Sequence, residues 1–393
     1  MTERKLDIVV YGATGFTGRL VCEYLNQQAG ANSDLVWAMA GRSQAKLAGV
    51  QQELGIPDSV PLVVADAEDP ASIDAMVADA RVVLTTVGPY QLYGSALVAA
   101  CAAAGTDYVD LCGEPNWMVD MIRAHGGTAR ASGARILFSC GFDSIPFELG
   151  VYFLQQKAKA TFGAALPRVK GRVRGMKGGF SGGTLASLKA TMAAASVEPG
   201  LRDLLASPFA LTEGFTGPDQ PAGLAPVHDE DIGSWSAPFV MATINTKNVH
   251  RSNLLMGHPY GKDFVYDEML LTGPGEKGEA AARAVAADKS MASSTLQPGD
   301  GPSRAERENG MFDVLFVGSN DKGDALSVSV KGTMDPGYGT TSKMIAETAL
   351  CLVRHPEAAS GGIWTPGAAL QDLLIERLEE NAGMSFVVES GAD

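Results

Sequence analysis

Cysteine, positive charge and long apolar runs are all scarce in this sequence of 393 residues. The five cysteines form no C-x-x-C pair and stand beside no histidine cluster, which excludes a disulfide framework and predicts no metal site. Lys and Arg number 31 against 45 Asp and Glu, so the net charge of -14 argues against wholesale nucleic-acid binding. No run approaches the roughly 18 apolar residues of a membrane span, and the N-terminal apolar run is too short for a signal peptide. We therefore expect a cytoplasmic protein that meets any anionic ligand at a local site.

Strand-like runs, apolar and rich in β-branched residues, alternate with helical patterns through the first 140 residues or so. The runs typical of strands cover residues 6–11, 35–40, 60–65, 82–87, 108–111 and 136–139. Helical patterns lie between them, for example at 16–28, 71–78 and 95–104. This βαβ alternation is typical of a doubly wound parallel sheet with helices on both faces. The sequence therefore predicts an α/β protein with a Rossmann-like sheet.

The rhythm changes after Cys140, where the strand-like pieces become longer and residues 207–233 are rich in proline and glycine. A polar, proline-rich passage of that length has little to bury and indicates a surface loop. Residues 339–352 and 368–380 are helical again. We expect a second, α+β domain after the first, and we expect the end of the chain to return to the first domain.

A glycine-rich turn lies between the first predicted strand and the first predicted helix. Residues 12–18 read Gly-Ala-Thr-Gly-Phe-Thr-Gly, which is the spacing G-x-x-G-x-x-G. Glycines in this position let the backbone approach a pyrophosphate, whose charge the free N–H groups at the helix N-terminus stabilise. The alternative is a plain strand-to-helix turn. The candidate cofactor residues here are Gly12, Ala13, Thr14, Gly15, Phe16 and Thr17.

The end of the second predicted strand favours NADP over NAD. An Asp or Glu that binds a free 2′-hydroxyl normally stands about 20 residues beyond the glycines, but here the residues are Arg42 and Ser43. Arg42 can pair with a 2′-phosphate and Ser43 can hydrogen-bond to it; the alternative is an exposed arginine at a helix start. Asp66, at the end of the third strand, is placed to face the adenine amino group or, alternatively, to cap the next helix.

Two loops are candidates for the reacting end of the site. Val87, Gly88 and Pro89 follow the fourth strand at the carboxyl edge of the sheet, where Gly88 would admit the nicotinamide ribose. Tyr90 and Tyr93 come next and are candidate proton donors, although aromatic loop residues more often serve packing. In the glycine-rich loop 178–184, Ser181 is a candidate to hold a substrate carbonyl; the alternative is a series of β-turns. The candidate catalytic residues are Tyr90, Tyr93 and Ser181, and Val87, Gly88, Pro89 and Tyr90 are candidate cofactor-binding residues.

These motifs, taken in order, resemble the saccharopine dehydrogenase-like oxidoreductases. Within them the chain is most similar to the bacterial branch that includes the mycobacterial trans-acting enoyl reductases of lipid biosynthesis. The resemblance spans nearly the whole chain. Besides the glycine turn, it rests on residues 105–114, 140–146, 178–184, 238–242, 251–252, 335–339 and 362–366.

The resemblance implies an NADP-binding Rossmann domain at 1–145, an inserted α+β substrate domain at 146–335, and a C-terminal segment, 336–393, that packs back on the Rossmann domain. It implies an NADP-dependent oxidoreductase that reduces an enoyl thioester in lipid or polyketide biosynthesis. One alternative is reduction of an imine or amino-acid conjugate, as in saccharopine reductases. Ser144 and Ile145 replace the Pro-Gly pair of those enzymes, which counts against an amino-acid substrate. The other alternative is a non-catalytic NADP-binding protein associated with lipid.

Positive charge gathers in one place, since residues 151–177 contain seven Lys and Arg and no Asp or Glu. Lys170, Arg172 and Arg174 alternate, so they share one face of a strand. We expect residues 170–174 to dock an acyl carrier protein or the phosphates of a pantetheine thioester; the alternative is a solvated or charge-protected strand face. A small-molecule or carrier-bound acyl substrate is expected. A peripheral membrane contact, and the choice between monomer and homodimer, stay open.

Overall fold

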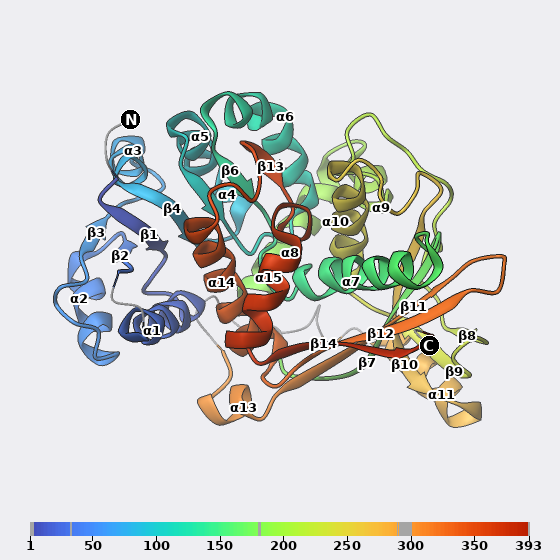
Figure 1. Ribbon diagram of the computed structural model, residues 1–393. Helices are drawn as coiled ribbons and strands as arrows, with labels where there is room; N and C mark the ends of the chain where they lie inside the picture. Colours follow the sequence, from blue (N-terminus) through green and yellow to red (C-terminus); the bar gives the residue numbers. More distant parts are fainter. Residues whose placement is uncertain (1–3, 32–33, 180–181, 289, 291–300, 392–393) are drawn as a thin grey trace.

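The computed structural model describes residues 4–31, 34–179, 182–288, 290 and 301–391 and contains two seven-stranded sheets (Figure 1). The first sheet has the order β13-β6-β5-β4-β1-β2-β3, and every neighbouring pair is parallel. Its strands are β1 (Leu6–Tyr11), β2 (Trp37–Gly41), β3 (Leu62–Val64), β4 (Ala80–Thr85), β5 (Asp107–Val109), β6 (Arg135–Leu137) and β13 (Gly362–Trp364). The predicted Rossmann-like parallel sheet is confirmed.

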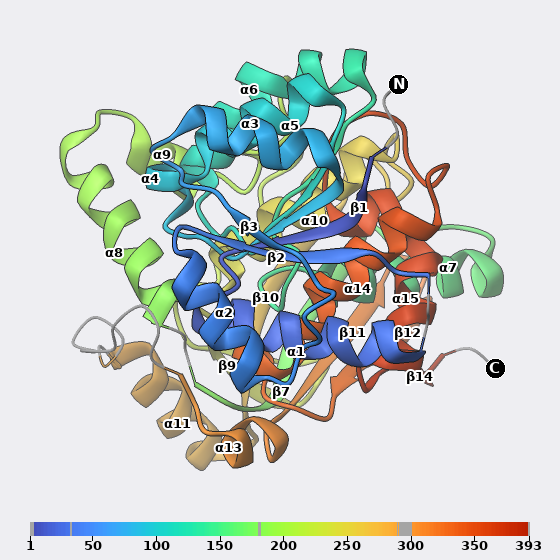
Figure 2. The ribbon, with the colours of Figure 1, turned by 90° about the vertical axis from the view of Figure 1, so that its left-hand side faces the viewer.

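Both faces of this sheet are buried under helices. Successive side chains of each strand point to opposite sides, so each strand contributes to both cores. In β1, Ile8 and Val10 belong to one apolar core, whereas Val9 and Tyr11 belong to the other. Figure 2 shows the helix layers above and below the sheet. One layer contains α3 (Pro70–Asp79), α5 (Ser95–Ala104) and α6 (Pro115–Ser132), and the other contains α1 (Phe16–Ala31) and α14 (Thr341–Arg354). A further helix, α2 (Gln44–Glu53), joins β2 to β3.

The second sheet has the order β14-β12-β11-β7-β10-β9-β8 and is mixed, with β7 and β10 parallel and the other neighbours antiparallel. Its strands are β7 (Arg168–Lys177), β8 (Val227–Asp229), β9 (Ser234–Pro238), β10 (Val265–Gly273), β11 (Met311–Ser319), β12 (Ala325–Gly332) and β14 (Met384–Ser390). Helices α7 (Ile145–Phe162) and α15 (Pro366–Asn381) connect it to the first sheet, α10 (Ala242–Leu255) packs on β10 and α7, and α11 (Gly275–Ala287) packs on β9 and β10. This is the second, α+β part of the predicted fold.

Helix α7 packs closely on the second sheet because it carries a glycine at the contact. A Cβ atom on Gly150 would lie 2.2 Å from the Phe316 ring of β11, so only glycine permits this approach. Phe147, three residues earlier in α7, meets the rings of Phe142 and Phe316 edge to face. These contacts fix the start of α7, which follows β6 in the chain.

The end of the chain contributes to both sheets. Helix α14 covers one face of the first sheet and β13 forms its edge, whereas β14 pairs with β12 of the second sheet. The expectation that all of 336–393 packs on the Rossmann domain therefore needs correcting at β14, since the hydrogen bonds of that strand go to the other sheet. Among the described helices, none has the length and apolarity needed to cross a membrane.

Candidate active site

A cavity of about 770 Å³ lies at the carboxyl ends of β1 to β6, where open parallel sheets bind their ligands. Its walls also include residues of α4 (Tyr90–Tyr93), α8 (Gly182–Val197), α9 (Leu201–Ala206), the start of α10 and the π-helical turn η1 (Pro336–Thr340). The sheet order sets the order of residues along the cavity. Asp66 and Arg42 lie at one end, Gly12 and Gly88 lie in the middle, and Asp143 lies beyond them.

The glycine turn has the backbone that its sequence predicts. Gly12 has a φ of 95°, and a Cβ atom there would lie 2.8 Å from both Thr86 Oγ1 and Val87 Cγ2. A Cβ atom on Gly18 would lie 2.1 Å from the carbonyl oxygen of Gly12. The turn therefore presents bare backbone and the start of α1, whose first N–H groups have no partner within the helix. The predicted residues that line the cavity are Gly12, Thr14, Gly15, Phe16 and Thr17.

Ala13 lies behind the turn instead of at the cavity. Its side chain is fully buried, and its N–H donates to the carbonyl of Ala40 at 3.1 Å. Phe16 packs edge to face on Tyr338 of η1, with the ring centroids 4.6 Å apart. The turn is thus tied to β2 behind it and to η1 in front of it.

Arg42 is exposed at the end of β2, lines the cavity, and has no hydrogen bond or ion pair with any residue that the structure describes. It is therefore free to bind a phosphate. Ser43 does not line the cavity; its hydroxyl caps α2 by accepting from the Lys46 N–H at 3.3 Å. Asp66 does line the cavity, and the alternative that it caps α3 is wrong, because Asp69 is the cap residue.

The loop after β4 is held by a buried carboxylate that the sequence reasoning missed. Glu114 accepts hydrogen bonds from the backbone N–H groups of Tyr90 and Gln91, each at 2.9 Å, and from Ser187 Oγ at 2.7 Å. It thereby fixes α4 and ties α8 to the cavity floor. Val87 and Gly88 line the cavity, whereas Pro89 stands at the N-cap of α4 and does not. The sequence signal that could have identified Glu114 is a charged residue directly after Gly113, in a motif that follows a predicted strand.

The three predicted catalytic residues differ in their surroundings. Tyr90 lines the cavity, but its hydroxyl accepts from the Leu111 N–H at 3.0 Å and donates to the Thr85 carbonyl at 3.4 Å. Burial raises the pKa of Tyr90 well above its ordinary value. Tyr93 lies at the cavity rim and is 41% exposed. Ser181 lies outside the described residues. Their catalytic roles remain predictions.

Asp143 is a further candidate that the sequence analysis did not single out. Its carboxyl lines the cavity without a hydrogen-bond or ion-pair partner among the described residues, and burial raises its pKa to about 7. Both neighbours of Asp143 are held in place. The Phe142 N–H donates to Thr341 Oγ1 at 3.0 Å, and Asn248 Nδ2 donates to Ser144 Oγ. A fixed carboxyl that holds its proton near neutral pH can act as a general acid.

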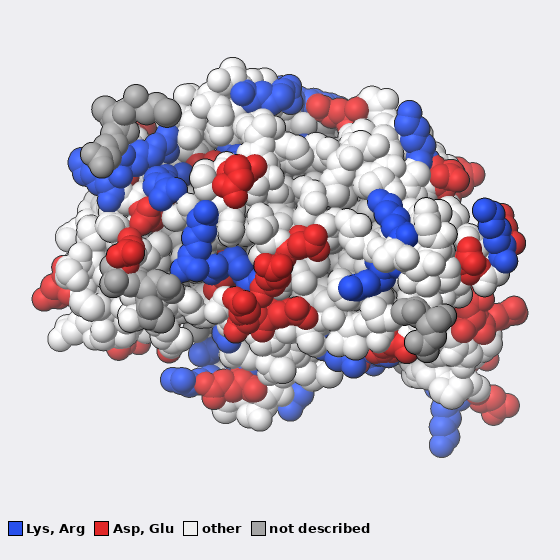
Figure 3. Space-filling view, in the orientation of Figure 1, with Lys and Arg blue, Asp and Glu red and all other residues white. Residues whose placement is uncertain are grey.

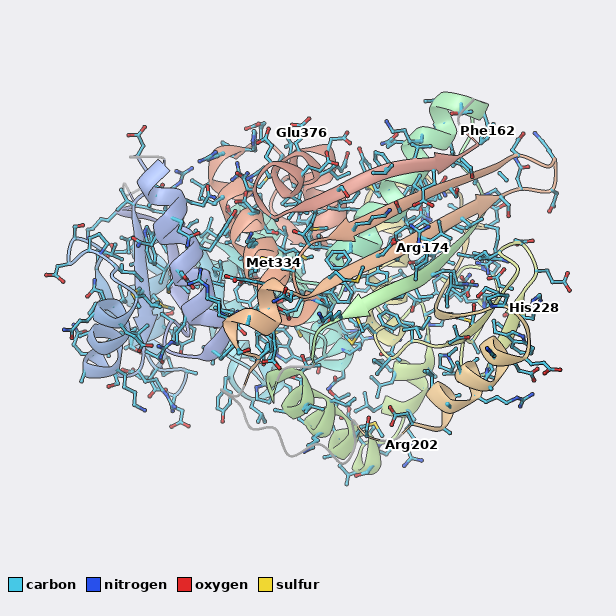
Figure 4. The ribbon with its side chains drawn as sticks, turned by 90° about the horizontal axis from the view of Figure 1, so that it is seen from below. Phe162, Arg174, Arg202, His228, Met334 and Glu376 are labelled. Atoms are coloured by element: carbon cyan, nitrogen blue, oxygen red, sulfur yellow. The ribbon has the colours of Figure 1, made fainter. Side chains whose placement is uncertain are left out.

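The basic stretch lies elsewhere, on β7, and each of its alternating cations has carboxylate partners. Arg172 is buried between Asp229 and Asp267, with N–O distances of 2.9 Å to each. Lys170 pairs with Asp229 at 2.8 Å, and Arg174 pairs with Asp313 at 2.8 Å. Figure 4 shows Arg174 over the strands of the second sheet, apart from α8. The charge of residues 170–174 is therefore neutralised internally, which removes the basis on which we expected a carrier protein to dock there.

The fold and this cavity define an NADP-dependent oxidoreductase with a Rossmann domain. Residues 8–137 match the family described as "Saccharopine dehydrogenase NADP binding domain". A trans-acting enoyl reductase of Mycobacterium bovis (strain BCG / Pasteur 1173P2) is 37% identical over 96% of both chains, and one of Mycobacterium ulcerans (strain Agy99) is 35% identical over the same shares. The chain belongs to this family of trans-acting enoyl reductases.

A solved structure shares the fold along the whole chain. The apo saccharopine dehydrogenase (L-Glu forming) of Saccharomyces cerevisiae has a TM-score of 0.56 and 12% sequence identity, over 98% of this chain and 100% of that one. At that identity the likeness shows the fold alone. The predicted family, fold class and NADP cofactor are thereby confirmed.

The residues present fit NADP. The bare backbone at Gly12 suits a pyrophosphate, and the free Arg42 guanidinium suits a 2′-phosphate. From β2 to β6 is four strand spacings, so Arg42 and Asp143 lie on the order of 20 Å apart along the sheet edge. A dinucleotide bound at the 2′-phosphate end of the cavity therefore extends toward Gly88 and Asp143.

Proposed function

We propose that this protein reduces the carbon–carbon double bond of an enoyl thioester in lipid or polyketide biosynthesis, using NADPH. The observation that carries the proposal is the Asp143 carboxyl, which has no partner among the described residues and lines the same cavity as the dinucleotide turn and the apolar residues of α8, α9 and α10. The names of the relatives from M. bovis and M. ulcerans support it. We place the reaction in the cytoplasm, on an acyl substrate that is free or bound to a carrier.

Reduction of an enoyl thioester needs a hydride at the β-carbon and a proton at the α-carbon. When bound, NADPH supplies the hydride. The chain supplies the proton: the Asp143 carboxyl donates it to the α-carbon as the π electrons of the double bond move there, and solvent then restores the proton to Asp143. Tyr90 is less suited to this step, because both hydrogen-bonding capacities of its hydroxyl are already in use.

The apolar lining distinguishes this proposal from reduction of an amino-acid conjugate. A substrate with several carboxylates needs converging Lys or Arg side chains. Among the described lining residues Arg42 is the only Lys or Arg, and it stands at the far end of the cavity from Asp143. The wall formed by α8, α9 and the start of α10 carries Leu, Met, Val and Ile side chains beside uncharged Ser and Thr. An uncharged acyl chain suits this wall better than a polycarboxylate does.

The test is the pH dependence of turnover in the Asp143→Asn variant. Since burial raises the pKa of Asp143 to about 7, wild-type kcat should fall as the pH rises through 7 and the acid form is lost. The variant should lose this decline and about 100-fold or more in kcat at pH 6. Stopped-flow absorbance of NADPH with trans-2-octenoyl pantetheine thioester measures both.

Two controls complete the experiment. Asp74→Asn changes an exposed carboxyl on α3, outside the cavity, and should leave kcat and its pH profile unchanged. NADPH affinity, measured by fluorescence, should be the same in both variants. Wild-type kcat and pH profile in Asp143→Asn would refute the acid role. Tight NADPH binding without oxidation by any enoyl thioester would instead favour a non-catalytic protein.

A further inference from the structure

Helix α8 forms a wall of the cavity and stands away from both sheets, beside α4 and α9 (Figure 2). Two hydrogen bonds fix the rotation of α8 about its axis. Ser187 Oγ donates to Glu114 at 2.7 Å, and Gln91 Nε2 donates to Thr191 Oγ1 at 3.3 Å. Ser187 and Thr191 are four residues apart, so they share one side of the helix. Both line the cavity, together with the neighbouring row of the same helix, Leu188 and Met192.

A second wall of the same cavity is mostly apolar. Its apolar residues are Leu205 of α9, and Val240, Met241 and Ile244 at the start of α10, with Thr243 beside them. Between α8 and the start of α10 the cavity opens to solvent, and large apolar side chains are exposed at this rim. Met192 is 61% exposed and Val240 is 39% exposed, although both line the cavity. Apolar side chains that stay in water at the mouth of a cavity indicate a surface that an apolar ligand covers.

This arm of the cavity is lined by residues of α8, α9 and the start of α10, and its described lining residues carry no Lys, Arg, Asp or Glu, which favours an uncharged occupant. The arm is continuous with the space at Asp143, so its occupant is joined to the group that reacts there. We propose that α8 and the start of α10 form an acyl-chain channel that binds the hydrocarbon tail of the substrate and sets its preferred length. This inference rests on the proposed function only for the identity of the group at Asp143.

Chain-length dependence of binding tests the channel without requiring turnover. The ligands are saturated butanoyl, octanoyl and dodecanoyl pantetheine thioesters, titrated calorimetrically into the protein with NADP⁺. Burial of a methylene group is worth about fourfold in affinity, so even partial burial should strengthen binding at least tenfold from butanoyl to octanoyl. Equal affinity for the three thioesters would overturn the channel.

Glutamate substitutions at neighbouring positions test which side of α8 lines the channel. Met192→Glu places a charge in the channel at an already exposed position and should abolish the gain with chain length while leaving butanoyl binding unchanged. Ala193→Glu changes the adjacent exposed residue, which does not line the cavity, and should preserve the gain. Val240→Glu, on the second wall, should repeat the Met192→Glu result. If Met192→Glu and Val240→Glu both kept the chain-length gain, the channel would not lie between α8 and α10.

Other occupants of the rim give different results. If a second copy of the chain covers it, sedimentation velocity shows a dimer that Met192→Glu dissociates, with chain-length dependence unaltered; that result refutes the channel. Flotation with phosphatidylcholine vesicles that depends on Met192, again without chain-length dependence, refutes it in favour of a lipid surface. Failure of every enoyl thioester to be reduced, with dodecanoyl binding still dependent on Met192, contradicts the proposed function and retains the channel.

Discussion

Arg42 is the residue on which we expect the choice of NADP to depend. Its guanidinium is exposed at the cavity and has no protein partner among the described residues. Charge-assisted contacts to a phosphate contribute about 1.5–3 kcal/mol each. Arg42→Glu should therefore weaken NADPH binding by tenfold or more and leave NADH binding nearly unchanged, as measured by calorimetry. Lys46→Glu, which changes a cation one turn later in α2, is the control and should have little effect. Equal losses for the two cofactors would show that the 2′-phosphate is bound elsewhere.

The residues of the site were predictable to the extent that they act through backbone shape. The glycines of residues 12–18 are required by the turn itself, so their pattern was visible in the sequence. Asp143 was not identified, because its proposed role depends on its burial and on the absence of a partner among the described residues. Its position depends on contacts such as Thr341 to Phe142, which join residues distant in the chain. Glu114 was missed for the same reason, since its partners Tyr90 and Ser187 lie 24 residues before it and 73 residues after it.

At the scale of elements, β7 shows what an alternating pattern establishes. The pattern correctly placed Lys170, Arg172 and Arg174 on a strand. It could not reveal that β8, β10, β11 and β14 bring carboxylates to that strand, because the side-chain hydrogen bonds join residues 57 to 215 positions apart in the chain. The proline-rich passage 207–233 is without helix or strand up to residue 226, as expected, but the expectation of a loop is wrong at its end, where β8 forms. Both β8 and the following β9 were not foreseen because they are short.

The ion pairs of β7 predict an acid dependence of stability. Hydrogen bonds from Arg174 lower the pKa of Glu389, on β14, to about 2 from its ordinary 4.5. A carboxyl with a lowered folded-state pKa stabilises the fold fully above its unfolded pKa, and the effect is lost as the pH falls through the folded value. Glu389→Gln should thus reduce the free energy of unfolding at pH 7 by up to about 1 kcal/mol, since the pair is partly exposed.

The difference between wild type and Glu389→Gln should shrink between pH 4.5 and 2. Urea unfolding at pH 7, 5 and 3.5 measures it. Glu376→Gln, at an exposed carboxyl of α15 (Figure 4), is the control and should show no such trend. A difference that grows on acidification would contradict the assigned pair.

At the scale of the whole molecule, acidic side chains are spread over the surface, and many Lys and Arg side chains form ion pairs with Asp or Glu. On the face shown in Figure 3, Lys and Arg are interspersed with Asp and Glu. The net charge of -14 therefore coexists with a local cation, Arg42, at the cavity. The two sheets are joined by three segments, α7 after β6 and then α14 and α15 near the end of the chain. Neither sheet is completed by a continuous stretch of sequence.

This shared architecture predicts that residues 1–145 do not fold independently. That fragment lacks α14, whose fully buried Met344, Ile345 and Leu352 cover one face of the first sheet, and it lacks the edge strand β13. The uncovered face should leave the fragment without cooperative thermal unfolding by circular dichroism and with fast amide exchange in β1 and β4. A chain that ends at Gly383 is the control. It loses only β14, from the second sheet, and should keep slow exchange in β1 and β4. Cooperative unfolding of the fragment at the melting temperature of the full chain would mean that α14 and β13 are dispensable to the first sheet.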